Sequence, residues 1–433
     1  MRLEKDPGSV LCVNNLPWAR KEWVELDAGQ DGITVLDAGR RIPQCCRDGK
    51  VYFLGEIPAG GMKRYDIAYE ETSPELGKIK ERSVKEIRNE YLHLVLNERN
   101  GIEKLEDPQG NCYLSKAWDF LTVQKDLGGM QIEDCRGSEI YATTGHISVG
   151  EVCSDAMGER IEMSGVFPVM SWNRKNRLSW KIEFALRQGE RGLRVKVTLD
   201  WKGDTSRIRL KVPCAFEGRD VYHEIPFGVI KREAYSNLPT AKGEWPVQRF
   251  AALENGKMGV ALINTGVAGV EQEGRTLAST LIRAYGDGPD AWVRPTALSR
   301  QEGIRTFEFM ILPYLGNYQT AQVQKAAQEF NQRIEGVEGK SGLCREEVSF
   351  FELEGDGLVL SAIKKAWDHT GELVVRIYES EGKRSQGKFR LAGMKEAWIS
   401  DMKEEKGRRL TCAYDTVALE FTPFEIRTLR VRV

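Results

Sequence analysis

The feature that most constrains the fold is a run of alternating residues at positions 178–216, "LSWKIEFALRQGERGLRVKVTLDWKGDTSRIRLKVPCAF". In each of its three segments, apolar side chains recur at every second position, which is the period of a strand with one buried face. The polar turns "RQGERG" and "KGDTS" separate the segments. We therefore predict a meander of antiparallel strands that buries one face against a second sheet.

Short alternating runs of the same kind fill most of the chain. They form a small β unit that ends near residue 80, and strands then continue from about residue 86 for roughly 230 residues without an internal repeat. A region of this length predicts a large two-sheet sandwich, and the last ~90 residues suit an immunoglobulin-like sandwich. The predicted fold class is mainly β, with a large super-sandwich at 85–336 between two small β-sandwich domains at 1–80 and 341–433.

One segment, "TAQVQKAAQEFNQRIEG", has the period of a helix instead. Its apolar side chains fall on a single helical face, and we expect the helix to end at Gly336. The residues of this face are Val323, Ala326, Ala327, Phe330 and Ile334.

The composition excludes several classes of partner. Lys and Arg number 63 and Asp and Glu number 64, so the net charge of −1 favours neither nucleic acid nor an anionic membrane. We find no apolar run near the ~20 residues of a membrane span and no apolar signal core at the start.

Nine cysteines without a C-x-x-C pair favour free thiols in the cytoplasm. Four scattered histidines provide no local metal motif, so no metal site or cofactor is predicted in this chain.

The stretch "VYHEIPFG" contains the adjacent pair His223 and Glu224. Neighbours on a strand point to opposite faces, so the two side chains would not act on one substrate atom unless a bulge intervened. The alternative is a strand end that precedes a turn at 226–228.

Further along, Trp245 and Arg249 could line a sugar site, where an indole stacks on apolar ring faces and a guanidinium donates to hydroxyls. The alternative there is a Trp that closes one end of the sandwich and an Arg that pairs with a neighbouring acid.

Several stretches, in the same order, resemble the C-terminal half of glycoside hydrolase family 38 α-mannosidases. "VNNLPWAR" is similar to the opening of that half, and "GVALINTGVAGVEQEGRTLASTLIRA", "RTFEFMILPYLG" and "FTPFEIRTLRV" are similar to later segments. The most specific resemblance is a pair of motifs, E-I-P-F-G-x-I-x-R followed by E-x-P-x-Q-R-F. Its residues here are Glu224, Ile225, Pro226, Phe227, Gly228, Ile230, Arg232, Glu244, Pro246, Gln248, Arg249 and Phe250.

The resemblance implies a sandwich similar to the galactose-mutarotase fold, packed in the complete enzyme against an N-terminal catalytic barrel. In that family the barrel supplies the nucleophile and the zinc ligands, and no stretch here matches its motifs. No catalytic or metal-binding residue is therefore carried over, zinc is implied only for the missing domain, and we expect the chain alone to be inactive. We predict that Glu224, Glu244, Trp245 and Arg249 contact a glycan or the domain interface. The implied partners are a catalytic barrel domain or chain and a mannose-containing oligosaccharide, and a homo-oligomer is allowed.

Two alternatives belong to other functional classes. A free-standing sugar epimerase of the mutarotase type would use His223 or His146 with a carboxylate as acid and base. A carbohydrate-binding module would instead present exposed indoles for stacking, with Trp118, Trp245 and Trp292 as the candidates.

Overall fold

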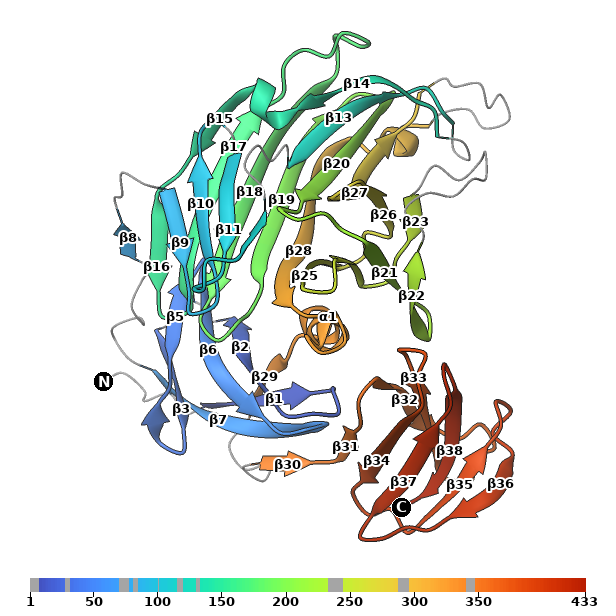
Figure 1. The fold of residues 1–433 in the computed structure, drawn as a ribbon. Helices are drawn as coiled ribbons and strands as arrows, with labels where there is room; N and C mark the ends of the chain where they lie inside the picture. Colours follow the sequence, from blue (N-terminus) through green and yellow to red (C-terminus); the bar gives the residue numbers. More distant parts are fainter. Residues whose placement is uncertain are drawn as a thin grey trace.

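The computed structural model describes residues 8–27, 32–69, 78–80, 85–99, 101–114, 120–129, 133–232, 244–286, 296–339 and 347–433. Strands dominate these residues, so the predicted mainly β class is confirmed. Figure 1 shows an N-terminal sheet, a large central sandwich and a C-terminal sandwich, with helix α1 (Val323–Asn331) where they approach one another.

The N-terminal sheet folds over on itself, so that strands from both of its halves share one apolar core. Two of its strands come from far along the chain: β29 lies between β1 and β2, and β30 pairs with β7. The predicted boundary at residue 80 stays a prediction, but the sheet is completed by residues beyond 334. Its strands are β1 (Gly8–Asn14), β2 (Arg20–Asp27), β3 (Ile33–Asp37), β4 (Arg40–Arg41), β5 (Gln44–Arg47), β6 (Lys50–Ile57), β7 (Gly61–Tyr69), β29 (Glu335–Gly339) and β30 (Glu347–Ser349).

The central sandwich packs one large sheet against two smaller ones. The large sheet contains β8 (Lys78–Lys80), β15 (His146–Val149), β16 (Val152–Asp155), β17 (Gly158–Val166), β18 (Arg177–Arg187), β19 (Leu193–Lys202), β21 (Asp220–Ile225), β22 (Gly228–Arg232), β24 (Phe250–Glu254), β25 (Met258–Asn264) and β28 (Gly303–Leu315). A short sheet contains β9 (Lys85–Arg88), β10 (His93–Asn97), β11 (Gly101–Glu106) and β12 (Cys112–Leu114). The charged sheet, so named for its outer face, contains β13 (Leu121–Asp126), β14 (Cys135–Tyr141), β20 (Ser206–Pro213), β23 (Glu244–Pro246), β26 (Gly269–Glu273) and β27 (Thr276–Ala284).

The predicted meander is only partly correct. β18 and β19 pair antiparallel over most of their length, as expected. β20 instead crosses to the charged sheet, where it pairs with β13 and β27. The turn between β19 and β20 contains Gly203 at φ +146° and Thr205 at φ +51°, backbone conformations that redirect the chain. The apolar face of β20 therefore packs against β19 from the opposite layer, within the same core as the fully buried Trp201.

Helix α1 covers the outer face of the large sheet. Val323, Ala327 and Phe330 are buried against residues of β24, β25 and β28, so the predicted helical face is confirmed for them. The predicted end at Gly336 is wrong, because the helix ends at Asn331 and Gly336 pairs with β1. Strand pairing outcompetes a further helical turn here, and Ile334 joins the core of the N-terminal sheet.

The C-terminal sandwich has two facing sheets around its own apolar core. One sheet contains β31 (Phe351–Glu354), β34 (Ser385–Leu391) and β37 (Thr416–Phe421). The other contains β32 (Leu358–Lys365), β33 (Leu373–Glu379), β35 (Glu396–Ser400), β36 (Lys406–Leu410) and β38 (Ile426–Arg432). Cysteines within the described residues are free thiols, as predicted. Within the same residues, no helix combines the length and the apolar character needed to cross a bilayer.

Candidate functional site

Glu224 and Arg249, two of the predicted contact residues, form a buried ion pair. The Glu224 side chain on β21 is fully buried, and the Arg249 side chain just before β24 is 16% exposed. The guanidinium donates to both carboxylate oxygens, with Nε 2.8 Å from Oε2, and the backbone N–H of Arg249 donates to Oε2 at 3.1 Å. This two-point geometry satisfies both charges inside the protein, which a buried pair requires.

The same pair joins the central sandwich to α1 and to the C-terminal sandwich. Gln324 on α1 directs its amide nitrogen at Glu224 over 3.4 Å and accepts a 2.6 Å hydrogen bond from the Ser380 hydroxyl. The Tyr378 hydroxyl of β33 lies within hydrogen-bond reach of Arg249. Burial raises the pKa of Tyr378 to about 12, so this hydroxyl stays neutral at physiological pH. We call this cluster of Glu224, Arg249, Gln324, Tyr378 and Ser380 the junction.

The turn of the "EIPFG" motif supplies the apolar part of the junction. Phe227 has a φ of +65°, and its ring meets the Tyr378 ring edge-on with 5.4 Å between centroids. At the next position a Cβ would lie only 3.2 Å from the Phe424 ring, which explains why Gly228 follows. The most specific stretch of the sequence therefore builds contact between two sandwiches. Whether Glu224 or Arg249 also contacts a glycan or a catalytic domain stays a prediction.

Glu244 and Trp245 lie apart from this pair, on β23 at the edge of the charged sheet. Glu244 is 3.6 Å from the guanidinium of Arg207, and burial raises the pKa of its carboxyl. The half-buried Trp245 ring is covered on one face by the guanidinium of Arg232, 4.5 Å from the ring centroid. The acid that pairs with Arg249 is thus Glu224, 25 positions away in the chain.

Sequence analysis missed the charged outer face of the sheet that contains β20. The alternation in "SRIRLK" places Arg207, Arg209 and Lys211 on one face, and that in "VEQEG" places Glu271 and Glu273 beside them, so the signal was present. Burial raises the pKa of Glu271 to about 7, even though Arg209 acts in the opposite direction. The cations of this face are all paired with carboxylates: Arg207 with Glu133, Arg209 with Glu139, Glu271 and Glu273, and Lys211 with Glu139 and Glu273.

His223 and Glu224 do point to opposite faces, as predicted. Glu224 faces α1, whereas His223 lies on the core-facing side of β21 and is 1% exposed. Burial and, to a smaller extent, the positive charge of Arg232 lower the pKa of His223 to about 4. Among the described residues, neither ring nitrogen has a hydrogen-bond partner, so no carboxylate is placed to share its proton. His146, the other candidate base, is exposed on β15.

We expect the protein to lose stability between pH 6.5 and pH 4 because of His223. An unfolded histidine takes up a proton near pH 6.5, whereas buried His223 does so only near pH 4. The unfolded state therefore binds more protons in this window, and stability falls as the pH drops, by about 2 kcal/mol at pH 5. Urea unfolding at pH 7.5 and pH 5 should show that His223→Gln loses about 2 kcal/mol less than the wild type between the two values. Equal losses would contradict this assignment.

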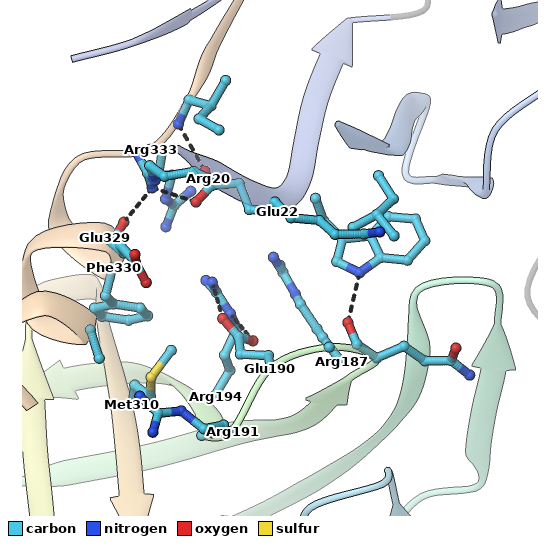
Figure 2. A pocket seen from close by; sticks show the side chains of 18 of the residues that line it. Arg20, Glu22, Arg187, Glu190, Arg191, Arg194, Met310, Glu329, Phe330 and Arg333 are labelled. Atoms are coloured by element: carbon cyan, nitrogen blue, oxygen red, sulfur yellow. Dashed lines mark hydrogen bonds and ion pairs between the residues drawn. The ribbon is translucent and has the colours of Figure 1, made fainter. Parts of the chain in front are cut away.

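A cavity of about 450 Å³ lies between the N-terminal sheet, the β18–β19 turn and α1. Figure 2 shows the Arg187 side chain reaching from this turn toward the strand that carries Glu22. The turn "RQGERGLR" places Arg187, Arg191 and Arg194 close together in the sequence, and this cluster of arginines was the missed sequence signal. Met310, Leu312 and Phe330 form an apolar wall on the other side. The cavity thus combines cations, carboxylates such as Glu22 and Glu329, and an apolar surface, as ligand sites do.

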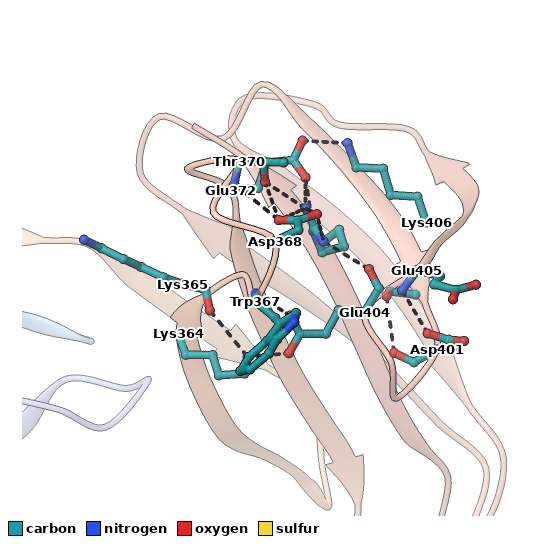
Figure 3. A network of polar contacts seen from close by, with 12 residues as sticks. Lys364, Lys365, Trp367, Asp368, Thr370, Glu372, Asp401, Glu404, Glu405 and Lys406 are labelled. Atoms are coloured by element: carbon teal, nitrogen blue, oxygen red, sulfur yellow. Dashed lines mark hydrogen bonds and ion pairs between the residues drawn. The ribbon is translucent and has the colours of Figure 1, made fainter.

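A second polar cluster lies at one end of the C-terminal sandwich, around Arg430 of β38. Figure 3 shows Asp368, Glu372 and Lys406 converging there, beside the turn that carries Trp367. The Trp367 side chain is 83% exposed. The indoles named as stacking candidates from the sequence are placed differently: Trp245 is half-buried, and Trp118 and Trp292 lie outside the described residues.

Comparison with known proteins identifies one family twice along the chain. A model described as the glycosyl hydrolases family 38 C-terminal domain matches residues 87–290, and one described as the family 38 C-terminal beta sandwich domain matches residues 357–429. The first range contains most of the central sandwich, with Glu224 and Arg249 but without β8 and β28, and the second contains most of the C-terminal sandwich, with Tyr378. Four of the five junction residues thus lie inside matched regions, and Gln324 of α1 lies between them.

Individual relatives agree with the family models. A Halalkalibacterium halodurans protein, provisionally named a mannosylglycerate hydrolase, is 26% identical over 58% of this chain and 28% of its own length. Human alpha-mannosidase 2C1 is 25% identical over 55% of this chain and 23% of its own length. The crystal structure of an Enterococcus faecalis alpha-mannosidase superimposes with a TM-score of 0.79 at 14% identity, over 99% of this chain and 56% of that one. The chain thus spans about a quarter of the length of the two curated relatives, the Halalkalibacterium protein and the human mannosidase. Together with the two family models, these comparisons show that the chain belongs to the C-terminal β-domain region of glycoside hydrolase family 38.

Proposed function

We propose that this chain is the C-terminal β-domain region of an α-mannosidase-like glycoside hydrolase and that mannoside hydrolysis needs a catalytic domain beside it. The observation that carries the proposal is the asymmetry of the structural match. The fold superimposes along 99% of this chain but accounts for only 56% of the Enterococcus faecalis mannosidase. The remainder of that enzyme has no counterpart among the residues of this chain. We infer that a catalytic domain, on the same or another polypeptide, takes the place of that remainder.

The residues that the structure describes do not fit a zinc site. In the part of the chain that the structure describes, no three His, Cys, Asp or Glu side chains are grouped as metal ligands. His223, one of the two bases considered for the epimerase alternative, faces Arg232 rather than an acid, and the other, His146, is exposed on β15. No catalytic step is therefore derived through residues of this chain. Zinc and the nucleophile belong to the proposed catalytic domain.

The contribution of this chain in the proposal is a rigid support. The junction fixes the C-terminal sandwich and α1 to the central sandwich through buried hydrogen bonds. Strand β29, which follows α1 in the chain, joins the N-terminal sheet by pairing with β1. A support of this kind holds a neighbouring domain in one orientation because buried polar contacts have few alternative arrangements. A mannose-containing oligosaccharide is the proposed substrate of the assembled enzyme.

The test is hydrolysis of an aryl α-mannoside by the purified chain, with and without added zinc, and with and without the catalytic part of a family 38 α-mannosidase. We expect no turnover by the chain alone in either zinc condition, and co-elution with the catalytic part in size-exclusion chromatography. The mixture should hydrolyse the substrate at least ~10-fold faster than the catalytic part alone, as expected if the chain positions the catalytic groups.

Two outcomes would contradict the proposal. Zinc-dependent turnover by the chain alone, lost on chelation, would mean that this chain assembles its own metal site. Absence of both co-elution and activation with the catalytic part would remove the role as a support. Chelation of the active mixture is the control, because it should abolish turnover without separating the two parts.

A further inference from the structure

Arg187 differs from the other arginines around the cavity of about 450 Å³. Among the described residues its side chain has neither a carboxylate partner nor a hydrogen-bond acceptor, and its Nε–H is buried, like that of Arg20, without an acceptor. The guanidinium also borders a smaller neighbouring cavity of about 170 Å³. The surrounding arginines are all occupied: Arg20 with Glu22, Arg47 with Asp155, Arg194 with Glu190, Arg333 with Glu308, and Arg191 with the carbonyl of Ala321.

The surroundings of Arg187 make an unpaired charge costly. Burial, together with the positive charges of Arg194, Arg47 and Arg333, lowers its pKa to about 10, against the attraction of Glu190. Both carboxylate oxygens of Glu190 accept from Arg194, at 2.6 and 2.7 Å, so the charge of this acid is already offset by a second cation. An added anion would therefore gain a charge-assisted contact and relieve repulsion among the cations.

The rest of the cavity is suited to a small polyhydroxy compound. Its volume lies in the range of small-molecule sites. Phe330 and Met310 offer apolar surface to C–H groups, and the carboxylates of Glu22 and Glu329 are acceptors for hydroxyls. Both carboxylates already have donors, Arg20 for Glu22 and the Trp18 indole for Glu329, so they are held in place.

We propose that this cavity binds a small polyhydroxy anion, a sugar phosphate or a sugar acid, whose phosphate or carboxylate pairs with the guanidinium of Arg187. The planar fork of Arg187 matches either group at two points, and the hydroxyls of the ligand donate to Glu22 and Glu329. This assignment goes beyond the proposed function, because it concerns a ligand of this chain and requires no catalytic domain.

The test compares ligand binding by the wild type, Arg187→Gln and Arg174→Gln. The control Arg174 is an exposed arginine on a turn and loses the same charge. The probes are glucose 6-phosphate, gluconate, inorganic phosphate and uncharged glucose, with isothermal titration for Kd and thermal unfolding for Tm. We expect saturable binding of glucose 6-phosphate or gluconate by the wild type and by Arg174→Gln, a rise in Tm of about 3 °C near saturation, and no effect of glucose.

For Arg187→Gln we expect a Kd at least about tenfold weaker and loss of the Tm rise. Without ligand, this variant should melt at the same temperature as the wild type or higher, because removal of an unpaired cation relieves repulsion. A merely structural role for Arg187 would lower the Tm in the absence of ligand. That result, or no binding of any anionic probe by the wild type, or equal binding by Arg187→Gln, would overturn the proposal.

Discussion

Arg249→Met should destabilise the protein by about 3–5 kcal/mol, because it leaves Glu224 charged, buried and without its cation. Glu224 is fully buried, and its remaining side-chain partner would be the amide of Gln324 at 3.4 Å. Urea unfolding at pH 7.5 measures the loss. The matched control is Arg136→Met, which removes an arginine that is 67% exposed and paired with Asp134 on the surface. That change should cost at most about 1 kcal/mol.

A double variant separates the buried charge from lost packing. Glu224→Gln combined with Arg249→Met leaves no unpaired charge, so it should recover a substantial part of the loss of Arg249→Met. Limited proteolysis adds a second readout, because the junction holds the C-terminal sandwich through Tyr378 and Ser380. We expect cleavage between the sandwiches to accelerate in Arg249→Met. If the single and double variants are equally unstable, the cost is due to packing rather than to the buried charge.

Arg430→Met should cost about 3 kcal/mol, and the loss should be confined to the C-terminal sandwich. Arg430 is 3% exposed and donates to Asp368, to Glu372, to the Thr370 hydroxyl at 2.9 Å and to the carbonyl of Glu404 at 3.1 Å. It therefore connects the β32–β33 turn with the β35–β36 turn across the end of the sheet. Its loss leaves Glu372, which is 7% exposed, with Lys406 as its remaining charged partner.

The measurement for Arg430 is urea unfolding followed by tryptophan fluorescence and by far-UV circular dichroism. Arg409→Met is the control within the same sheet, because Arg409 is 64% exposed and pairs with Glu396 at the surface. We expect at most about 1 kcal/mol for the control. Hydrogen exchange should show faster exchange in β33 and β38 of Arg430→Met and unchanged exchange in β18 and β19. A cost for Arg430→Met no larger than that of the control would contradict the anchoring role.

Local features of the fold could be predicted from the sequence because they depend on period alone. The two-residue alternation in β18 and β19 correctly predicted strands, their pairing and their buried faces. The helical spacing of Val323, Ala327 and Phe330 predicted α1 and its buried face. The same logic placed His223 and Glu224 on opposite sides of β21. Each of these inferences needs only residues within about two turns or one strand of each other.

The partners of these elements depended on the tertiary structure. β20 continues the alternating pattern of β18 and β19, yet it pairs in the opposite layer, because the strand period contains no information about which sheet a strand joins. β29 likewise completes a sheet that begins more than 300 residues earlier in the chain. The paired motif at 224–250 pointed to the family, while its role in joining two sandwiches became visible only with Tyr378 and Phe424 beside it.

For the polar sites too, some features follow from the sequence and others only from the tertiary structure. The sequence by itself determined that this is a β-rich member of a glycosidase family and which charged residues alternate along its strands. Only the tertiary structure decided which charges are paired, since Glu224 meets Arg249 from 25 positions away and Arg47 meets Asp155 from 108 positions away. It also decided that Arg187 remains without a carboxylate among the described residues. Such pairings arise from the packing of distant elements, and their energy depends on burial that no local pattern specifies.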